Sequence, residues 1–140
     1  MPRDNLLCKV CRMLEILKCT ICGKICMVVH NGSGTSVCCG QPMERQVEQG
    51  EDPGKEKHVP VVVKTQTGIQ VKVGEIPHPM TAEHHIQWIE VIDGSSLSVK
   101  GLQPGDSPTK EFAHTDPAVK VRAYCNKHGL WSNKLSKTHH

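Results

Sequence analysis

The chain has 140 residues, enough for one ordinary domain or two small ones, and a net charge of +3. This charge is small and evenly spread, which argues against a nucleic-acid partner. No run approaches the roughly 18 apolar residues of a membrane span and the N-terminus does not fit a signal peptide, so we expect a cytoplasmic protein without membrane contact.

Residues 1–47 are expected to form a small metal-binding domain with an N-terminal extension. Two cysteine-bearing segments, 18–24 and 37–40, flank an apolar run at 25–29 and a turn-forming sequence at 31–34. This pattern is typical of a hairpin with a metal knuckle at each end.

Residues 48–55 are polar and rich in turn formers, which predicts a linker. A second domain is expected at 56–132 and a polar tail at 133–140. Short strands are expected at 59–65, 69–73, 86–92, 97–102, 110–114 and 119–124. In the last of these, Val119, Val121 and Ala123 alternate with Lys120, Arg122 and Tyr124. Short strands separated by turns predict a mainly β protein with an antiparallel β-sandwich.

Cysteine and histidine are unevenly distributed along the chain. Seven of the 8 cysteines precede residue 40, and six of the 9 histidines lie between residues 58 and 128. Closely spaced cysteines in a cytosolic protein bind metal or perform redox chemistry more often than they form disulfides. The distribution predicts a thiolate-rich metal site followed by an imidazole-rich one.

Four of the early cysteines have the spacing of a metal site. Cys19 and Cys22 can bind one ion, and the adjacent pair Cys38 and Cys39 completes a four-thiolate set for zinc or a single iron. Because adjacent cysteines distort a tetrahedron, an iron centre and a structural zinc staple both stay open, as does a disulfide.

The other early cysteines have no clear partners. Cys8 and Cys11 form a further Cys-x-x-Cys pair that could bind metal, form a reversible disulfide or remain as surplus thiols. Cys26 lies in an apolar run, where a cysteine commonly acts as a small hydrophobic residue.

The second half supplies histidines and one more cysteine. The candidate ligands are His58, His78, His84, Cys125 and His128. Four imidazoles with one thiolate suit iron or copper and leave one coordination position open for chemistry. Neighbouring residues on a strand face opposite ways, so either His84 or His85 is the ligand, and counting back from Trp88 favours His84.

Both halves together resemble the desulfoferrodoxin family, the two-iron class of superoxide reductase, over about residues 14 to 131. The motifs are Cys19-x-x-Cys22-Gly, Cys38-Cys39-Gly-x-Pro-Met43, Glu56-Lys57-His58-Val-Pro-Val, Pro-His78-Pro-Met80 and Tyr124-Cys125-Asn-x-His128-Gly-x-Trp131. The resemblance implies a desulforedoxin-like domain followed by an immunoglobulin-like β-sandwich, usually as a homodimer.

The same resemblance implies two mononuclear non-haem irons per chain. One would be bound by Cys19, Cys22, Cys38 and Cys39, and the other by His58, His78, His84 and His128 with Cys125 as the axial ligand. The implied reaction is the one-electron reduction of superoxide to hydrogen peroxide, with electrons from an external donor such as rubredoxin. The four-thiolate iron would either relay electrons or be structural.

Two further residues gain roles from this resemblance. Lys57, beside His58, would attract the anion and organise water for proton delivery, and Glu56 would take the open position after the iron is oxidised. Three alternatives remain: a superoxide dismutase, a non-catalytic zinc ribbon joined to a β-sandwich binding module, and a pure electron carrier.

Overall fold

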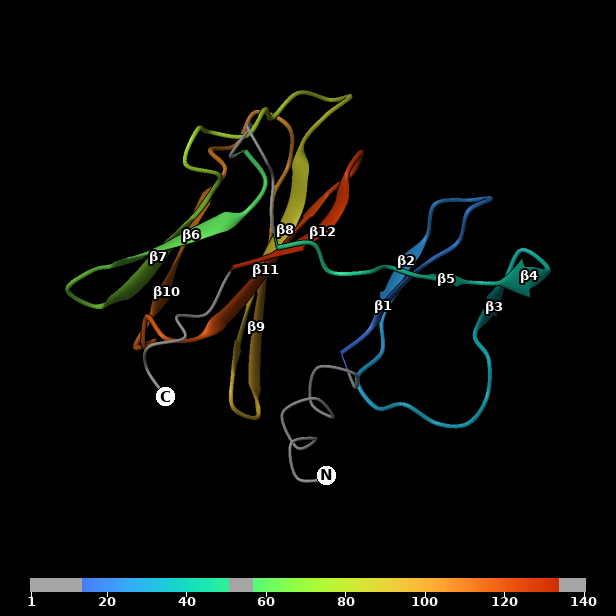
Figure 1. Cartoon of the computed structure of the whole chain (residues 1–140). Coiled ribbons are helices and arrows are strands. Elements are labelled where there is room, and N and C mark those ends of the chain that lie inside the picture. The colour runs from blue at the N-terminus through green and yellow to red at the C-terminus, as the bar shows by residue number, and fades with distance from the viewer. Residues whose placement is uncertain (1–13, 51–56, 134–140) are drawn as a thin grey trace. The chain divides into compact units, whose positions relative to one another are not determined.

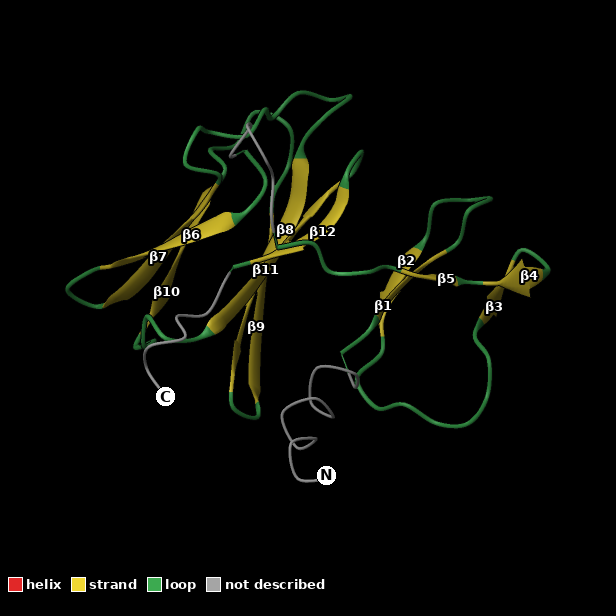
Figure 2. Cartoon of the chain, viewed as in Figure 1, coloured by secondary structure: helices red, strands yellow, loops and turns green. Residues whose placement is uncertain are grey.

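The computed structural model describes residues 14–50 and 57–133, and the chain divides into two compact units between Val47 and Glu48. Within these described ranges all regular elements are strands (Figures 1 and 2), which confirms the expectation of a mainly β protein. None of the described segments is a helix that could cross a membrane. Cys8, Cys11 and Glu56 lie outside the described residues.

The first unit consists of two very small antiparallel sheets. One has the order β2-β1-β5 and contains β1 (Ile16–Lys18), β2 (Ile25–Met27) and β5 (Glu44–Arg45); the other pairs β3 (Val37–Cys38) with β4 (Gln41–Pro42). Of the described residues in this unit, only Leu14, Ile16 and Cys19 are buried. So little burial cannot by itself offset the entropy of ordering the chain.

The hairpin of this unit is not the one that the sequence suggested. Strand β2 pairs with β1, across a turn that a backbone hydrogen bond of 2.8 Å from Cys19 to Lys24 closes. Gly23 has a φ of 85° there, a conformation that glycine adopts without strain. The turn-forming residues 31–34 join no paired strands, so the predicted hairpin was wrong. The reason is that the cysteine knuckle is itself the tight turn.

The second unit is an antiparallel β-sandwich (Figure 1). One sheet, of order β10-β7-β6, contains β6 (Pro60–Lys64), β7 (Gly68–Val73) and β10 (Thr109–Ala113); the other, of order β12-β11-β8-β9, contains β8 (Ile86–Asp93), β9 (Ser96–Gly101), β11 (Lys120–Cys125) and β12 (Gly129–Ser132). The expected sandwich is confirmed, and each expected strand is present to within one residue at either end. Strand β12 was not expected.

The core lies between the two sheets. It consists mainly of branched aliphatic side chains, with Ile69, Val71, Val73 and Phe112 on one side and Ile86, Ile89, Val91, Val121 and Ala123 on the other. Burying each such side chain contributes about 1.5–3 kcal/mol. The second unit therefore has a core of its own, unlike the first.

The opposite face of β11 is also covered, by an ionic network. Arg122 is 2% exposed and its guanidinium binds the carboxylate of Glu90, which is 0% exposed. Glu48 bridges Lys120 at 2.7 Å and Arg122 at 3.1 Å. Tyr124 stacks on Trp88 with ring centroids 4.8 Å apart. Glu48 belongs to the stretch that was expected to be a linker.

A β-bulge at the start of β8 controls the direction of the residues before it. Tyr124 pairs with Trp88 but Cys125 pairs with Ile86, so Gln87 is an extra residue opposite β11. The bulge lets Ile86 and Ile89 both face the core although they are three residues apart. It thereby also sets the direction in which the chain approaches β8.

Candidate metal centres

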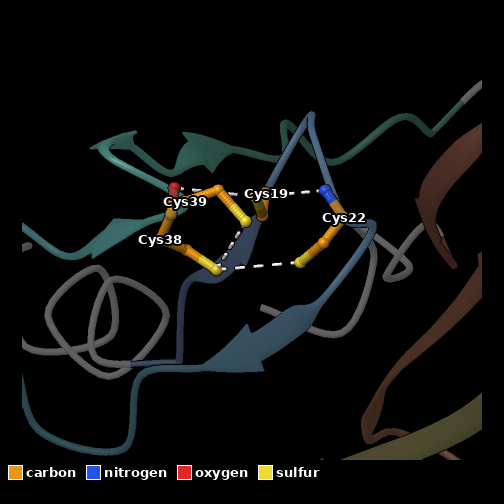
Figure 3. Close-up of side chains that lie close together, drawn as sticks. All are labelled: Cys19, Cys22, Cys38 and Cys39. Atoms are coloured by element: carbon orange, nitrogen blue, oxygen red, sulfur yellow. Dashed lines mark hydrogen bonds between the residues drawn. The ribbon is translucent and has the colours of Figure 1, made fainter.

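The first cluster brings the sulfurs of Cys19, Cys22, Cys38 and Cys39 together. Figure 3 shows these side chains converging from two turns. All four sulfur atoms lie within 4.8 Å of one another. The Cys22 and Cys38 sulfurs are 3.7 Å apart, and those of Cys38 and Cys39 are 4.0 Å apart.

These distances fit a single tetrahedral ion. Metal–sulfur bonds of about 2.3 Å place the sulfurs of a tetrahedron about 3.8 Å apart. The paired sulfurs of the cluster already have this separation, and the backbone N–H of Cys22 donates to the sulfur of Cys19 at 3.4 Å. The donor set fits zinc or iron equally well.

The turn between β3 and β4 explains how two adjacent cysteines can face one point. Cys39 and Gly40 have φ values of 55° and 79° and lie between the paired residues Cys38 and Gln41. Positive φ at both central residues of a two-residue hairpin is characteristic of a type I′ turn. The left-handed conformation of Cys39 turns its side chain toward that of Cys38, so the turn accommodates the crowding that the sequence suggested.

Hydrogen bonds within this cluster shift the pKa values of its thiols in opposite directions. The hydrogen bond from the Cys22 N–H helps lower the pKa of Cys19 to about 6. The sulfurs of Cys19 and Cys22 in turn raise the pKa of Cys38 to about 12. Four thiolates at this spacing would repel one another. A metal cation between them offsets this repulsion and so favours the deprotonated ligands.

The second cluster is a ring of four imidazoles. Neighbouring rings are edge to face, with centroid separations of 4.7 Å (His58–His78), 4.7 Å (His78–His84), 4.9 Å (His84–His128) and 4.8 Å (His128–His58). Across the ring, the centroids of His58 and His84 are 6.2 Å apart. The four rings therefore surround one central point.

This ring has the dimensions of a metal site. Half of the 6.2 Å diagonal is close to the sum of an imidazole's radius and a metal–nitrogen bond of about 2.0–2.1 Å. Nε2 of His58 and Nδ1 of His128 lie 3.1 Å apart, and two adjacent nitrogens on one metal are separated by about 3 Å at that bond length. The donors of His58, His78, His84 and Cys125 lie within 4.8 Å of one another.

The ring nitrogens themselves indicate a missing partner. Nε2 of His78 and Nε2 of His84 are buried and have no hydrogen-bond partner within the described part of the chain. Nδ1 of His78 lies 2.7 Å from the carbonyl oxygen of Pro79. A carbonyl only accepts, so Nδ1 carries the proton and Nε2 presents a bare lone pair to the centre.

Burial prepares the imidazoles for a cation. It lowers the pKa of His78 to about 4 and also lowers the pKa of His84. Both rings are therefore neutral at physiological pH, and only a neutral imidazole can bind a metal. A buried, unpaired nitrogen is costly without a partner, and a metal ion satisfies both nitrogens at once.

Cys125 belongs to the same cluster and is the most sheltered of its donors. Its side chain is 0% exposed, and its sulfur lies 3.8 Å from Nδ1 of His128 and accepts the His128 backbone N–H at 3.4 Å. Burial raises the pKa of this thiol. A metal ion would have to bring about its deprotonation.

The structure brings His84 into the cluster and leaves His85 out. The His85 ring instead donates from Nδ1 to the carbonyl of Thr81 at 3.0 Å. The backbone of His85 exchanges two hydrogen bonds with Asn126, and the Asn126 amide also donates to the carbonyl of Glu83 at 3.0 Å. Asn126 thus connects the segment bearing His84 with the turn between Cys125 and His128.

Lys57 and a tightly packed glycine lie beside His58. A Cβ added to Gly74, whose φ is 85°, would come within 2.5 Å of the carbonyl oxygen of Lys57. The Gly74 N–H also donates to the carbonyl of Val59 at 3.1 Å. Gly74 therefore allows the segment that carries His58 to pack directly against the backbone after β7.

Two contributors to this site had no assigned role in the sequence. Trp131 stacks on His58 at 4.7 Å and donates from Nε1 to the His128 carbonyl at 3.2 Å. Gln49 donates to the same carbonyl from Nε2 at 2.7 Å. Trp131 could have been found as the last residue of the Cys125 motif, whereas Gln49 lies in a polar stretch that carries no signal.

Comparisons with known families match almost the whole described chain. The desulfoferrodoxin family model matches residues 50–134, and the model of the desulfoferrodoxin N-terminal domain matches residues 11–45. The chain is 55% identical over 118 residues to a desulfoferrodoxin homolog of Methanothermobacter thermautotrophicus, covering 84% of this chain and 95% of the relative.

Two further comparisons involve proteins named superoxide reductase. The protein of Thermococcus kodakarensis is 36% identical over 120 residues, covering 67% of this chain and 97% of the relative. The crystal structure of the superoxide reductase from Treponema pallidum superposes with a TM-score of 0.69 at 28% identity, covering 86% of this chain and 97% of that one. The similarity to this structure spans both units.

Proposed function

We propose, from the premise that this chain belongs to the desulfoferrodoxin family, that it is a superoxide reductase. The observation that carries this function is the ring of four imidazoles beside a buried thiol. Two of its ring nitrogens, Nε2 of His78 and Nε2 of His84, are buried without a hydrogen-bond partner in the described chain. Structural zinc takes four ligands, so five converging donors of mixed softness point to a redox iron. An iron held by these five donors would be open to a substrate.

The proposed ligands follow from the two clusters. The catalytic iron would be held by Nε2 of His58, His78 and His84, Nδ1 of His128 and the sulfur of Cys125. The first iron would be held by Cys19, Cys22, Cys38 and Cys39. The chain therefore contains two mononuclear non-haem irons, one in each unit. We propose the domain limits 1–47 and 56–132, with 48–55 as the connection, of which Glu48 and Gln49 contact β11 and β12 of the second unit.

When bound, the second iron supplies one electron to superoxide, and two protons complete hydrogen peroxide. The protein's own contribution begins with Cys125, whose thiolate donates electron density and so favours reduction of the substrate. Its complete burial protects the sulfur from water and from competing reactions. The Pro79 carbonyl fixes the tautomer of His78.

Two residues that precede His58 in the sequence are proposed to handle the substrate and its protons. The ammonium group of Lys57 attracts the superoxide anion and orders water for proton delivery. Glu56 is proposed to be the carboxylate that would bind the oxidised iron after turnover.

A reductase needs an electron donor as well as superoxide. We propose rubredoxin as the donor, a homodimer as the assembly and the cytoplasm as the location. The first iron either relays electrons from the donor or stabilises the first unit. The colour of the purified chain tells whether this site holds iron or zinc, because a ferric tetrathiolate is coloured and a zinc site is colourless.

Stoichiometry tests the proposed function. The iron-loaded chain is reduced anaerobically and mixed with superoxide, and the peroxide formed is measured against the electrons consumed. A reductase forms one peroxide for each electron taken from the donor. A dismutase instead forms one peroxide for two superoxide ions and uses no donor, and that result would overturn the proposal.

The matched pair Cys125→Ser and Cys26→Ser tests the His/Cys cluster in this assay. Cys26 lies in β2, outside both clusters. We expect Cys125→Ser to abolish the reductive reaction and Cys26→Ser to retain it. Equal rates for both variants would contradict a role for the His/Cys cluster.

A further inference from the structure

Gln49 reaches the hairpin of the second cluster from a distant part of the sequence. Its backbone N–H donates to the Leu130 carbonyl and its carbonyl accepts the Ser132 N–H, both at 2.9 Å, so it pairs in parallel with Trp131 at the side of β12. Its side-chain Nε2 donates to the carbonyl of His128 at 2.7 Å. The backbone pairing directs the side chain at this carbonyl.

The segment before Gln49 is fixed by charge. Glu48 bridges Lys120 and Arg122, both on β11. Burial opposes ionisation of Glu48, yet the hydrogen bonds and charges of Lys120 and Arg122 lower its pKa. Glu48 is therefore ionised at neutral pH and holds the backbone of Gln49 in position.

His128 needs such support more than the other three imidazoles. His58 and His78 are buried and His84 is half-buried, but His128 is exposed. Packing therefore contributes least to holding His128. Its main chain is held instead, because its N–H donates to the Cys125 sulfur at 3.4 Å and its carbonyl accepts from Gln49 and from Trp131.

We propose that Gln49 is a positioning residue of the second metal centre. The side-chain amide of Gln49 fixes the direction of the His128 carbonyl and thereby limits the backbone torsions of His128. These torsions set both the position of the His128 ring and the hydrogen bond from the His128 N–H to the Cys125 sulfur. Hydrogen bonds to a ligating sulfur tune the electron density that it donates to a metal. This inference rests on the proposed function, since it assumes that iron binds at these residues.

The variant Gln49→Met isolates the side-chain contact. It keeps the length of the side chain and both backbone hydrogen bonds. It removes the amide donor, and with it the hydrogen bond to the His128 carbonyl at 2.7 Å and the longer one to the Leu130 carbonyl at 3.4 Å. In the iron-loaded full-length chain we expect the thiolate-to-iron charge-transfer band of the second iron to shift, while the bands of the four-cysteine iron stay in place. We also expect iron to be lost to a chelator about tenfold faster from the second site. Gln46→Met is the control, because the Gln46 amide also donates to a backbone carbonyl, that of Glu44 at 3.2 Å, in the first unit.

The outcomes separate positioning from mere stability. If Gln49→Met lowers the melting temperature but leaves both the band and the iron-release rate unchanged, the residue is only structural and the inference fails. If Gln49→Met does not fold, Gln49→Glu of the same shape takes its place, since it directs an oxygen at the carbonyl and is expected to shift the band as well. If the unaltered chain shows no thiolate-to-iron band beyond those of the four-cysteine iron, the proposed function fails instead.

Discussion

The two metal clusters of this chain are built in opposite ways. Four sulfurs of the first come from two tight turns in a unit with three buried described residues, and the thiols of Cys22 and Cys39 are exposed. The donors of the second come from several segments of a β-sandwich that has its own aliphatic core. The contrast indicates that a metal organises the first unit, whereas the fold organises the second site before any metal arrives.

Removing the metal should separate the two units most clearly. Stripping both ions with a chelator, or the variant Cys19→Ser, is expected to unfold the first unit, because metal binding by such sites supplies about 10–16 kcal/mol. Hydrogen exchange should lose protection in β1 and β2 and retain it in β8 and β11. Protection of β1 in the metal-free chain would break the comparison.

Within the second cluster, neighbouring histidines should have very different weights. His84→Ala removes one side of the imidazole ring, and we expect the loss of the second iron and a fall of at least about 100-fold in the rate with superoxide. His85→Ala is the control, since that ring binds the Thr81 carbonyl outside the cluster. Iron content and stopped-flow or pulse-radiolysis rates measure both. Similar losses of iron and of rate in the two variants would contradict the choice of His84 over His85 as the ligand.

The rigidity of the second site can be tested at a glycine. Gly74→Ala adds both left-handed strain and a collision with the Lys57 carbonyl, at a cost of about 3 kcal/mol in the free energy of unfolding. Gly94 is the control, because it has a φ of 62° but open space where a Cβ would lie. Gly94→Ala is expected to lower the free energy of unfolding by only about 1 kcal/mol. Urea unfolding of the two variants measures the difference in their free energies of unfolding. Equal values would show that the backbone near Lys57 can move to accommodate the added Cβ.

Charge near the second site should affect rate without affecting iron. Lys57→Ala is expected to slow the reaction with superoxide by about tenfold at low salt, because a nearby cation raises the local concentration of an anion. The difference should shrink as salt is added, and iron content should stay unchanged. Pulse radiolysis at several ionic strengths measures this, and an unaltered rate would remove Lys57 from the mechanism.

The smallest expected effect concerns the ionic network of β11. The pKa of Glu48 is lowered from 4.5 in the folded chain, despite its burial, by hydrogen bonds and charges from Lys120 and Arg122. Its stabilisation is thus complete above about pH 4.5 and is lost as the pH falls through the lower folded value. Glu48→Gln should cost about 1 kcal/mol at pH 7 and remove this acid dependence. Urea unfolding at pH 7 and pH 3 tests it, and an equal loss at both values would contradict the role of the charge.

Much of the fold could be read from local patterns. The strands of the sandwich have clean alternation or continuous aliphatic runs between turn formers, and these patterns depend only on nearby residues. Strand β12 was missed because Gly129–Ser132 is too short to show a period. The hairpin across residues 31–34 was wrong because turn propensity competes with the geometry of a cysteine knuckle, which sequence periodicity does not represent.

The sites were less accessible from local pattern. The spacing suggested which cysteines and histidines gather, but the choice between His84 and His85 depends on the bulge at Gln87, whose presence requires knowledge of the partner strand. Gln49 was invisible because its contacts with His128 and Leu130 span about eighty residues of sequence. Such contacts exist only once the sandwich has formed.

The exposure of Cys22 and Cys39 has a consequence for the working lifetime of the protein. Hydrogen peroxide oxidises accessible thiolates in steps that end in irreversible sulfinic and sulfonic acids. A chain that forms peroxide and also carries exposed cysteine sulfurs is expected to be oxidised first at its four-cysteine turns, whenever an ion leaves them. Cys125 is buried inside the sandwich and should be oxidised last. Aged preparations should therefore keep the metal centre of the sandwich after the cysteines of the first unit have been oxidised.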